Sequence, residues 1–282
     1  MIITNPLKNI LVLFFALFLL PVDAQNSVST KQDNVHILQE DFYIPQLERN
    51  RRIWIYLPLE YTKGNNKYPV IYLHDGQNLF DKSTSYIGEW NIDETLNEVE
   101  KAGYKNSIVV GIDNGGEKRI DELAPFVNKE YNRGGEGDRY MDFITHTLKP
   151  YIDSHYRTKK SRKNTTLGGS SLGALISVYG AVKHPETYGK IIAFSPAFWF
   201  NQKELANFIE NSSTKKVRSQ KYYFLQGAKE SDTIEVNTKA IIEKLKEKGL
   251  KQKNYYYFND PDGAHNEAYW SKVFKGAYLW LN

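Results

Sequence analysis

The chain has 282 residues, of which 41% are hydrophobic and 14% aromatic, so it can bury a full core and is neither a peptide hormone nor a disordered tail. Its 37 Lys and Arg residues and 33 Asp and Glu residues give a formal charge of +4. This positive charge is too small to indicate a dedicated nucleic-acid binder. The absence of cysteine excludes disulfides, thiolate metal sites, Fe–S clusters, a cysteine nucleophile and a lipoprotein anchor.

The first 24 residues are predicted to be a secretory signal peptide. Lys8 precedes an apolar run from residue 10 to residue 20, and Val22 and Ala24 occupy the −3 and −1 positions of a cleavage site. A membrane anchor needs about 20 apolar residues, roughly twice the length of this run. We therefore expect cleavage after Ala24, no membrane anchor, a secreted or periplasmic protein, and a disordered leader over the polar residues 25–34.

Residues 35–282 are predicted to form a single domain, because neither an internal repeat nor a linker rich in Pro, Gly or Ser divides them. Two strand-like stretches, 35–43 and 51–57, open this domain. The second stretch alternates between polar and apolar residues, which favours an antiparallel hairpin at the edge of a sheet.

The segments that follow the hairpin predict a parallel sheet. Residues 68–73 and 107–111 are nearly continuous apolar runs, typical of strands buried on both faces. The apolar spacing of residues 91–101 predicts a helix that joins them by a right-handed crossover. The later expected elements are helices at 139–151, 172–183, 234–248 and 267–281, and strands at 164–168, 190–194, 221–225 and 254–258. This alternation predicts one doubly wound, mostly parallel α/β domain.

A G-x-S-x-G motif is the sharpest chemical signal in the chain. Gly169, Ser171 and Gly173 form it, between a predicted strand and a predicted helix. This is the setting of a nucleophile elbow, where glycines flank the serine because side chains there would clash with neighbouring backbone. The helix N-terminus also favours the negative charge that develops in acyl transfer. The alternative is an ordinary glycine-rich turn, but the context favours Ser171 as a nucleophile.

A serine nucleophile needs a base, and in this fold the triad residues follow in the order Ser, acid, His. His184 lies at the far end of the helix that Ser171 begins, roughly 20 Å away, and is expected at the surface. His265 follows the last strand in a turn-rich loop, so it is predicted to be the general base and then the general acid. The alternative is a solvated loop histidine. His74 precedes the serine and is expected to orient its own loop.

The triad acid should lie in the loop that follows residues 221–225. Glu230 is the first choice and Asp232 is the competitor, since either carboxylate could accept the imidazole N–H and fix its tautomer. Asp232 precedes a helical stretch and could instead be its cap. Glu230 could instead be a solvated loop carboxylate.

The oxyanion hole is predicted from two backbone N–H groups. One belongs to Leu172, directly after the nucleophile, and the other to Gln77 in the loop after an early strand. Gly76 allows a close backbone approach in that loop.

Several motifs beyond the elbow occur in one order along the chain. They are Tyr56-Leu57-Pro58, His74-Asp75-Gly76-Gln77-Asn78-Leu79-Phe80-Asp81, Glu89-Trp90, Gly111-Ile112-Asp113-Asn114, Glu122-Leu123-Ala124-Pro125, Leu148-Lys149-Pro150-Tyr151-Ile152, Gly169-Ser170-Ser171-Leu172-Gly173 and Gly263-Ala264-His265-Asn266-Glu267. Over nearly all of residues 25–282 the chain thereby resembles the Putative esterase family, which includes esterase D, feruloyl and acetylxylan esterases, and enterochelin-type trilactone esterases. The resemblance implies an α/β-hydrolase fold and a serine carboxylic-ester hydrolase with Ser171, Glu230 and His265 at the triad positions. The family often has Asp where Glu230 stands.

Substrate contacts are predicted at three aromatic residues, Trp90, Phe198 and Trp199, because they fall in loops at the carboxyl ends of strands. Such rings suit a sugar or an aryl acyl group, although ordinary packing is an equal alternative. The sequence carries no H-E-x-x-H motif and no Cys/His set, so neither a metal nor a cofactor is predicted. Asp260, Asp262 and Glu267 lack the full spacing of a calcium loop and predict a turn.

The sequence therefore predicts an exported esterase that deacylates an acylated carbohydrate or a related natural product through a Ser171 acyl-enzyme. A siderophore trilactone esterase would use the same residues. A non-catalytic carbohydrate-binding protein on the same fold is the alternative from another class, and the ordered Ser, acid and His argue against it.

Overall fold

A single eight-stranded sheet forms the centre of the molecule in the computed structural model, which describes residues 28–213 and 217–282. The strands are β1 (Val35–Ile44), β2 (Arg49–Tyr56), β3 (Val70–His74), β4 (Ile108–Ile112), β5 (Thr165–Ser170), β6 (Lys190–Phe194), β7 (Lys221–Gly227) and β8 (Tyr255–Asp260). Their spatial order is β1-β2-β4-β3-β5-β6-β7-β8. The pairs β1–β2 and β2–β4 are antiparallel, and every other pair is parallel. The predicted mostly parallel α/β sheet with an antiparallel N-terminal edge is confirmed.

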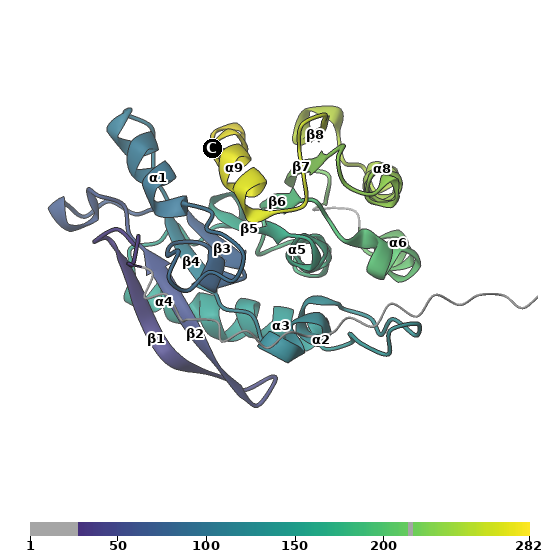
Figure 1. Ribbon diagram of the computed structural model, residues 1–282, viewed down its shortest axis with the longest axis horizontal. Coiled ribbons are helices and arrows are strands. Elements are labelled where there is room, and N and C mark those ends of the chain that lie inside the picture. The colour runs from purple at the N-terminus through teal and green to yellow at the C-terminus, as the bar shows by residue number, and fades with distance from the viewer. Residues whose placement is uncertain (1–27, 214–216) are drawn as a thin grey trace, which may run out of the picture.

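Helices cover both faces of the sheet (Figure 1). The α-helices are α1 (Ile92–Lys101), α2 (Arg119–Leu123), α3 (Gly137–Phe143), α4 (Lys149–His155), α5 (Leu172–Lys183), α6 (Gln202–Asn211), α8 (Asp232–Glu247) and α9 (Glu267–Leu281). α1 and α9 contact each other on one face, and their apolar residues share one buried cluster. The buried apolar residues of α3 to α6, and most of those of α8, belong to a second cluster on the other face.

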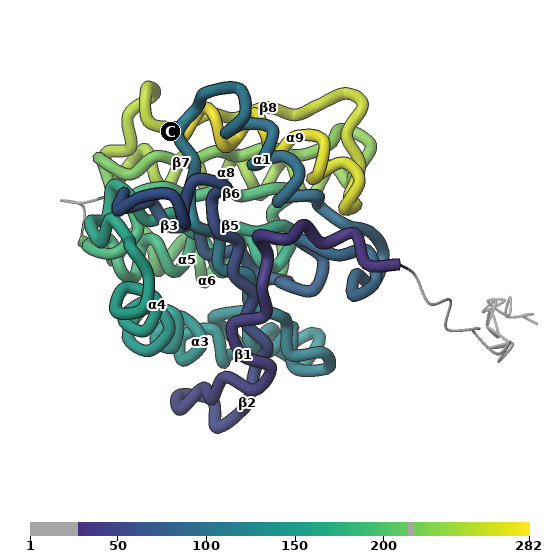
Figure 2. The backbone as a smooth tube through the Cα atoms, turned by 90° about the vertical axis from the view of Figure 1, so that its left-hand side faces the viewer, coloured from purple at the N-terminus to yellow at the C-terminus, as the bar shows by residue number. Residues whose placement is uncertain are grey.

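Strand β2 shows why the chain forms two cores. Ile53 and Ile55 belong to the cluster on the α5 side, whereas Trp54 and Tyr56 belong to the cluster on the α1 side. Successive strand residues point to opposite faces, and all four are buried, so this strand is covered on both sides. The turn of the β1–β2 hairpin projects beyond the rest of the domain (Figure 2).

The helix predicted over residues 139–151 is in fact three consecutive segments. α3 passes into a π-helical turn, Ile144–Leu148, and then into α4. Pro150 lies in the first turn of α4. Proline has no N–H to donate, and its ring would clash with the carbonyl of His146 in a regular helix, which accounts for the wider turn. α2 and α6 were not predicted. α2 is a single turn, and α6 buries only Leu205 and Ile209.

The polar segment before β1 differs from its prediction. The predicted signal peptide and residues 25–27 lie outside the described residues. Residues 29–34 were expected to belong to a disordered leader. In the structure, this segment instead forms hydrogen bonds with the rest of the domain. Ser29 Oγ donates to Asp81 at 2.6 Å, and Asn34 Nδ2 donates to the carbonyl of Leu57 at 2.7 Å. Within the described ranges, no helix combines the length and the hydropathy needed to cross a bilayer.

Candidate active site

Ser171 occupies a strained turn between β5 and α5. Its backbone angles are φ 55° and ψ −122°, a region that residues with side chains rarely adopt. Two backbone hydrogen bonds tie this turn to the neighbouring strand and loop. The Ser171 N–H donates to the carbonyl of Phe194 at 3.0 Å, and the Ser171 carbonyl accepts from the N–H of Ala197 at 3.0 Å. The sheet thus holds the serine in the geometry of a nucleophile elbow.

The flanking glycines are required by close backbone contacts. A Cβ atom added to Gly169 would lie 3.1 Å from the carbonyl carbon of Gly173. A Cβ atom added to Gly173 would lie 3.3 Å from the Cβ of His74. A larger residue at position 169 would therefore push β5 away from the start of α5, and one at position 173 would push α5 away from His74.

Glu230 and His265 form a short pair beside this turn. Glu230 Oε2 accepts from His265 Nδ1 at 2.7 Å, while Glu230 Oε1 accepts from Ser195 Oγ and from the N–H of Gly227, both at 2.7 Å. The Glu230 side chain is 1% exposed, against 37% for His265. Burial alone would raise the pKa of Glu230, but hydrogen bonds from His265, Ser195 and Gly227 outweigh it and lower that pKa. The carboxylate is therefore ionised, and both of its oxygens accept hydrogen bonds.

The loops that carry this pair are joined to each other. The N–H of Ala228 donates to the carbonyl of Asp260 at 2.7 Å, and the N–H of Lys229 donates to the carbonyl of Gly263 at 3.1 Å. A Cβ atom added to Gly227 would lie 2.1 Å from the Gly263 carbonyl carbon, so only glycine fits at this crossing. The distance between Glu230 and His265 is thus set by backbone contacts.

The competing acid, Asp232, lies elsewhere. It is exposed and forms the first residue of α8, and the cap of that helix is Ser231, whose Oγ accepts from the N–H of Thr233 at 3.3 Å. The alternative reading of Asp232 as the helix cap is therefore corrected, because the helix begins two residues earlier than expected and Ser231 precedes it. Among the described residues, Glu230 is the carboxylate that bonds His265.

Two other histidines occupy structural positions. His184 was expected at the surface, but it is 7% exposed, with Nε2 3.4 Å from the Asp142 carboxylate. That expectation is wrong because α5 packs beside the segment that carries Asp142. His74 is buried at the end of β3, its Nδ1 lies 3.0 Å from Tyr140 Oη, and burial lowers its pKa to about 4.

Ser195 and Trp270 complete the hydrogen-bond network, and neither was predicted. Trp270 Nε1 donates to Ser195 Oγ at 2.9 Å, and Ser195 in turn donates to Glu230. The ring of His265 packs edge-on against Trp270, with 5.1 Å between ring centroids. Ser195 directly follows β6 at the same sheet edge as Ser171, a placement that the sequence could have signalled.

A cavity of about 820 Å³ opens above the carboxyl ends of the central strands. Ser171, His265 and the predicted residues Gln77 and Trp90 all line it. Gln77 lies in a short 3₁₀ turn, Gly76–Asn78, and its side-chain oxygen accepts from the N–H of Asn114 at 3.1 Å. Leu172 is the first residue of α5, so its N–H has no acceptor within that helix. The two predicted oxyanion donors thus belong to segments that border one cavity.

Of the three predicted aromatic contacts, one lines the cavity. Trp90 does, although it is only 3% exposed. Phe198 is fully buried and packs edge-on against Phe224, and Trp199 packs edge-on against Tyr131, outside the residues that line the cavity. Phe198 lies in the apolar core because its 3₁₀ turn folds inward between β6 and α6.

Acidic side chains outnumber basic ones around the cavity. Arg119 donates to both carboxylate oxygens of Asp75, at 2.6 and 2.9 Å. Burial would raise the pKa of Asp75, but the guanidinium group and Asn114 lower it below its ordinary value. Asp113 and Glu267 also line the cavity, and burial raises the pKa of Asp113 to about 6 and also raises that of Glu267. The lining of the cavity therefore contains one guanidinium group and three carboxyl groups.

Comparisons with known proteins agree with this architecture. A family model described as Putative esterase matches residues 44–281. YbbA, an uncharacterised protein of Bacillus subtilis, is 27% identical over 243 residues, covering 82% of this chain and 92% of that protein. The ferri-bacillibactin esterase BesA of B. subtilis is 27% identical over 150 residues, covering 48% of this chain and 50% of that protein.

A solved structure supports the fold independently. A ferulic acid esterase superposes with a TM-score of 0.67 at 15% identity, covering 88% of this chain and 98% of that chain. At this identity the likeness establishes the fold, which is of the α/β-hydrolase type. Since the family model spans all of the strands after β1 and every α-helix from α1 to α9 that the structure describes, the chain belongs to the Putative esterase family.

Proposed function

We propose that the protein is a serine carboxylic-ester hydrolase that works through an acyl-enzyme on Ser171. The observation that carries the proposal is the 2.7 Å Glu230–His265 pair, whose histidine lines the same cavity as the strained serine. Glu230 accepts the Nδ1–H of His265, which leaves Nε2 as the basic nitrogen. The pair and the serine thus have the three roles of a catalytic triad.

The reaction then proceeds in two halves. Ser171 Oγ attacks the ester carbonyl while His265 Nε2 takes its proton, and the N–H groups of Leu172 and Gln77 stabilise the oxyanion. His265 returns the proton to the leaving alcohol, and the acyl group stays on Ser171. A water, deprotonated by the same imidazole, attacks the acyl-enzyme; His265 then gives that proton to Ser171 Oγ as the acyl bond breaks and the carboxylic acid is released.

The substrate that this cavity favours is a neutral, hydroxyl-rich ester, such as an acylated carbohydrate. Asp75, Asp113 and Asn114 offer hydrogen-bond acceptors and donors for hydroxyl groups, and Trp90 and Trp270 offer apolar ring faces. The excess of carboxyl groups over Arg119 disfavours a strongly anionic substrate. The ferulic acid esterase of the same fold supports an aromatic acyl group such as a feruloyl group.

A second candidate substrate is a siderophore ester. The partial identity with the ferri-bacillibactin esterase BesA favours it. The same triad would open such an ester, so the two substrates differ only in what the cavity must hold.

A matched panel of feruloyl-sugar, acetyl-sugar and catecholate trilactone esters tests the assignment. We expect the highest kcat/KM on a sugar ester. A preference of at least about tenfold for the trilactone, which corresponds to about 1.4 kcal/mol, would assign the protein to siderophore esters instead. Binding of the sugar without turnover of any ester, in a folded protein, would favour the non-catalytic carbohydrate-binding protein.

We further propose that the protein is exported after cleavage behind Ala24. The charged residue before a short apolar run and the small residues before the cleavage site support this. Mass spectrometry of the secreted and periplasmic fractions should find a mature chain that begins at Gln25. A protein with an intact Met1 in the membrane fraction would refute it.

A further inference from the structure

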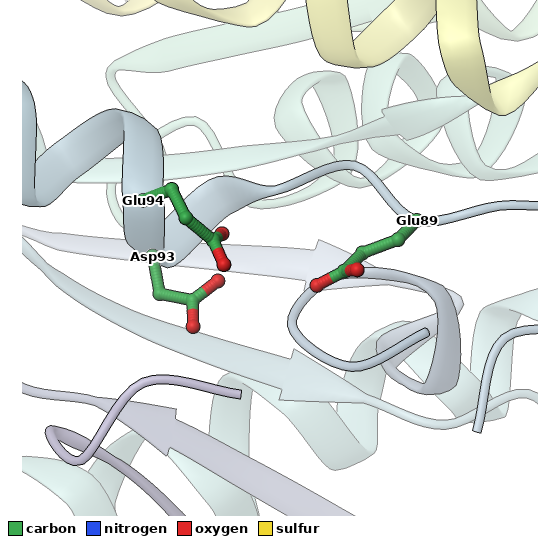
Figure 3. A group of neighbouring side chains, drawn as sticks. All are labelled: Glu89, Asp93 and Glu94. Carbon is green, nitrogen blue, oxygen red and sulfur yellow. The ribbon is translucent and has the colours of Figure 1, made fainter. Parts of the chain in front are cut away.

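Three carboxylates meet at the start of α1, away from Ser171. Glu89 lies in the loop that precedes this helix, and Asp93 and Glu94 lie in its first turn. One oxygen from each carboxylate lies within 4.8 Å of the others. Figure 3 shows the Asp93 and Glu94 carboxylates facing each other, with that of Glu89 directed toward the pair.

One oxygen of each carboxylate is bonded by the segment that precedes β1. Thr30 Oγ1 donates to Glu89 Oε2 at 2.7 Å. The N–H of Gln32 donates to Asp93 Oδ2 at 2.9 Å, and its Nε2 donates to Glu94 Oε1 at 3.2 Å. The N-terminal segment therefore satisfies half of this cluster.

The other oxygen of each carboxylate is buried without a partner. These atoms are Glu89 Oε1, Asp93 Oδ1 and Glu94 Oε2, and the Asp93 side chain is 0% exposed. Across the described ranges, no Lys or Arg forms an ion pair with any of the three. Burying a carboxylate oxygen without a hydrogen-bond donor raises the free energy of the folded state. A positive charge at the centre of this cluster would offset that cost.

We propose that Glu89, Asp93 and Glu94 bind a calcium ion. Carboxylate oxygens are the ligands that Ca²⁺ prefers, and a 2.3–2.6 Å bond to each places opposite ligands about 5 Å apart, which the spacing of this cluster fits. Ca²⁺ also tolerates irregular geometry and takes six to eight oxygens, so water can supply those that three carboxylates do not. Glu89 and Glu94 are partly exposed, which gives the ion a path from solvent.

The position of the site gives the ion a structural consequence. Glu89 is next to Trp90, which lines the active-site cavity and whose N–H donates to the carbonyl of Asn78 at 2.9 Å. A bound ion would connect this cavity wall to α1, and through Thr30 and Gln32 to the N-terminal segment. We expect calcium to stabilise the fold without taking part in ester cleavage.

Thermal unfolding of the mature chain tests the proposal. After treatment with EDTA and its removal, the melting temperature is compared with and without about 10 mM CaCl₂, roughly a hundredfold above the Kd of about 0.1 mM typical of extracellular calcium modules. We expect calcium to raise the melting temperature by about 5 °C. MgCl₂ at the same concentration should raise it by less than half as much.

Two variants separate the site from nonspecific binding. Asp93→Asn keeps the size of the side chain and replaces the buried carboxyl group by a neutral amide, so it should fold, and the calcium shift should fall below about 1 °C. Glu98→Gln changes an exposed carboxylate on the same helix, one that pairs with Lys275, and should keep the full shift. Tb³⁺ luminescence excited through Trp90 should appear in wild type, decline as Ca²⁺ displaces Tb³⁺, and be absent in Asp93→Asn.

Two results would overturn the proposal. One is a melting temperature that calcium leaves unchanged in wild type, which would mean that a shared proton between the carboxylates neutralises the cluster instead. The other is an equal calcium shift in wild type and Asp93→Asn, which would place the ion elsewhere.

Discussion

Two buried carboxylates in this protein have pKa values that are shifted in opposite directions. Glu230 receives three hydrogen bonds, from His265, Ser195 and Gly227, and these lower its pKa below the ordinary value. Asp93 is equally buried but receives one hydrogen bond, from Gln32, and faces Glu94. Burial, with a further contribution from Glu94, raises the pKa of Asp93 to about 8. Burial alone therefore does not decide ionisation; the number of donors does.

The two carboxylates therefore suit different roles. Glu230 belongs to the proposed catalytic site, whereas Asp93 belongs to a cluster that has no positive charge among the described residues to balance it. The Glu230 carboxylate is stable as an anion without any ion from solvent, so it can orient His265 at neutral pH. The Asp93 cluster needs either a proton or a cation to be stable. The predictions below test each half of this contrast.

The largest effect is expected from replacing the proposed nucleophile or the proposed base. With the fold intact, Ser171→Ala or His265→Ala should each lower kcat by roughly four to six orders of magnitude, because triad residues act as a unit. Turnover of p-nitrophenyl acetate, with circular dichroism as the check on folding, measures the loss. Near wild-type turnover by a folded Ser171→Ala protein would remove the serine from the mechanism.

Replacing the well-bonded carboxylate should have the next largest effect. Glu230→Gln should lower kcat by roughly three to four orders of magnitude, because an amide N–H facing Nδ1 favours the wrong tautomer of His265. Asp232→Asn is the matched control two residues away, and it should change kcat by less than about twofold, since that side chain is exposed. The opposite pattern in these two variants would move the triad acid to Asp232.

A smaller effect is expected from the serine that supports Glu230. Ser195→Ala removes the hydroxyl between Trp270 and Glu230 and should lower kcat about tenfold, with KM nearly unchanged, because it loosens the carboxylate without touching substrate. The acidic limb of the kcat profile, measured across pH in the same variant, should move to higher pH. An unchanged profile together with a fall in melting temperature alone would make Ser195 purely structural.

The smallest expected effect is on the pH dependence of stability. The stability that Asp93 contributes is lost as pH rises, whereas the stability that Glu230 contributes is lost as pH falls. Unfolded, Asp93 loses its proton near its ordinary pKa; folded, it keeps that proton until about pH 8, so calcium-free stability should fall as pH rises between these values. In EDTA, the melting temperature of wild type should drop from about pH 5 to about pH 8 by at least about 3 °C more than that of Asp93→Asn.

Glu230 provides the internal comparison for that measurement. Because its folded pKa is lowered, its contribution is present above its unfolded pKa and is lost only as the solution becomes more acidic. Glu230→Gln should therefore leave the slope of melting temperature against pH unchanged between about pH 5 and pH 8. Equal slopes in wild type and Asp93→Asn would contradict the account of the acidic cluster.

The sequence predicted most of the fold because hydrophobic periodicity and glycine spacing are local signals. The buried strands after residue 68 and the helix after Ser171 were accessible in this way. What the sequence could not supply are contacts between segments far apart in the chain. Ser195 bonds a residue 35 positions away and Trp270 one 75 positions away, and no local pattern marks either partnership.

The same limit explains the differences in the aromatic residues and at the N-terminus. Phe198 and Trp199 follow a strand end, as substrate-binding residues often do, but the direction of their 3₁₀ turn sends one ring into the core. Residues 29–34 are polar and lack periodicity, yet carboxylates from residues 81 to 94 accept hydrogen bonds from Ser29, Thr30 and Gln32. These carboxylates lie 52 to 61 positions downstream, too far for a local pattern to indicate them.

The most direct test of the central claim is the reaction of the folded protein with a fluorophosphonate probe, followed by peptide mass spectrometry. The account predicts one adduct per chain, located on Ser171, with labelling that is lost in Ser171→Ala and strongly slowed in His265→Ala. An adduct on another serine, or no adduct on a folded protein, would contradict it.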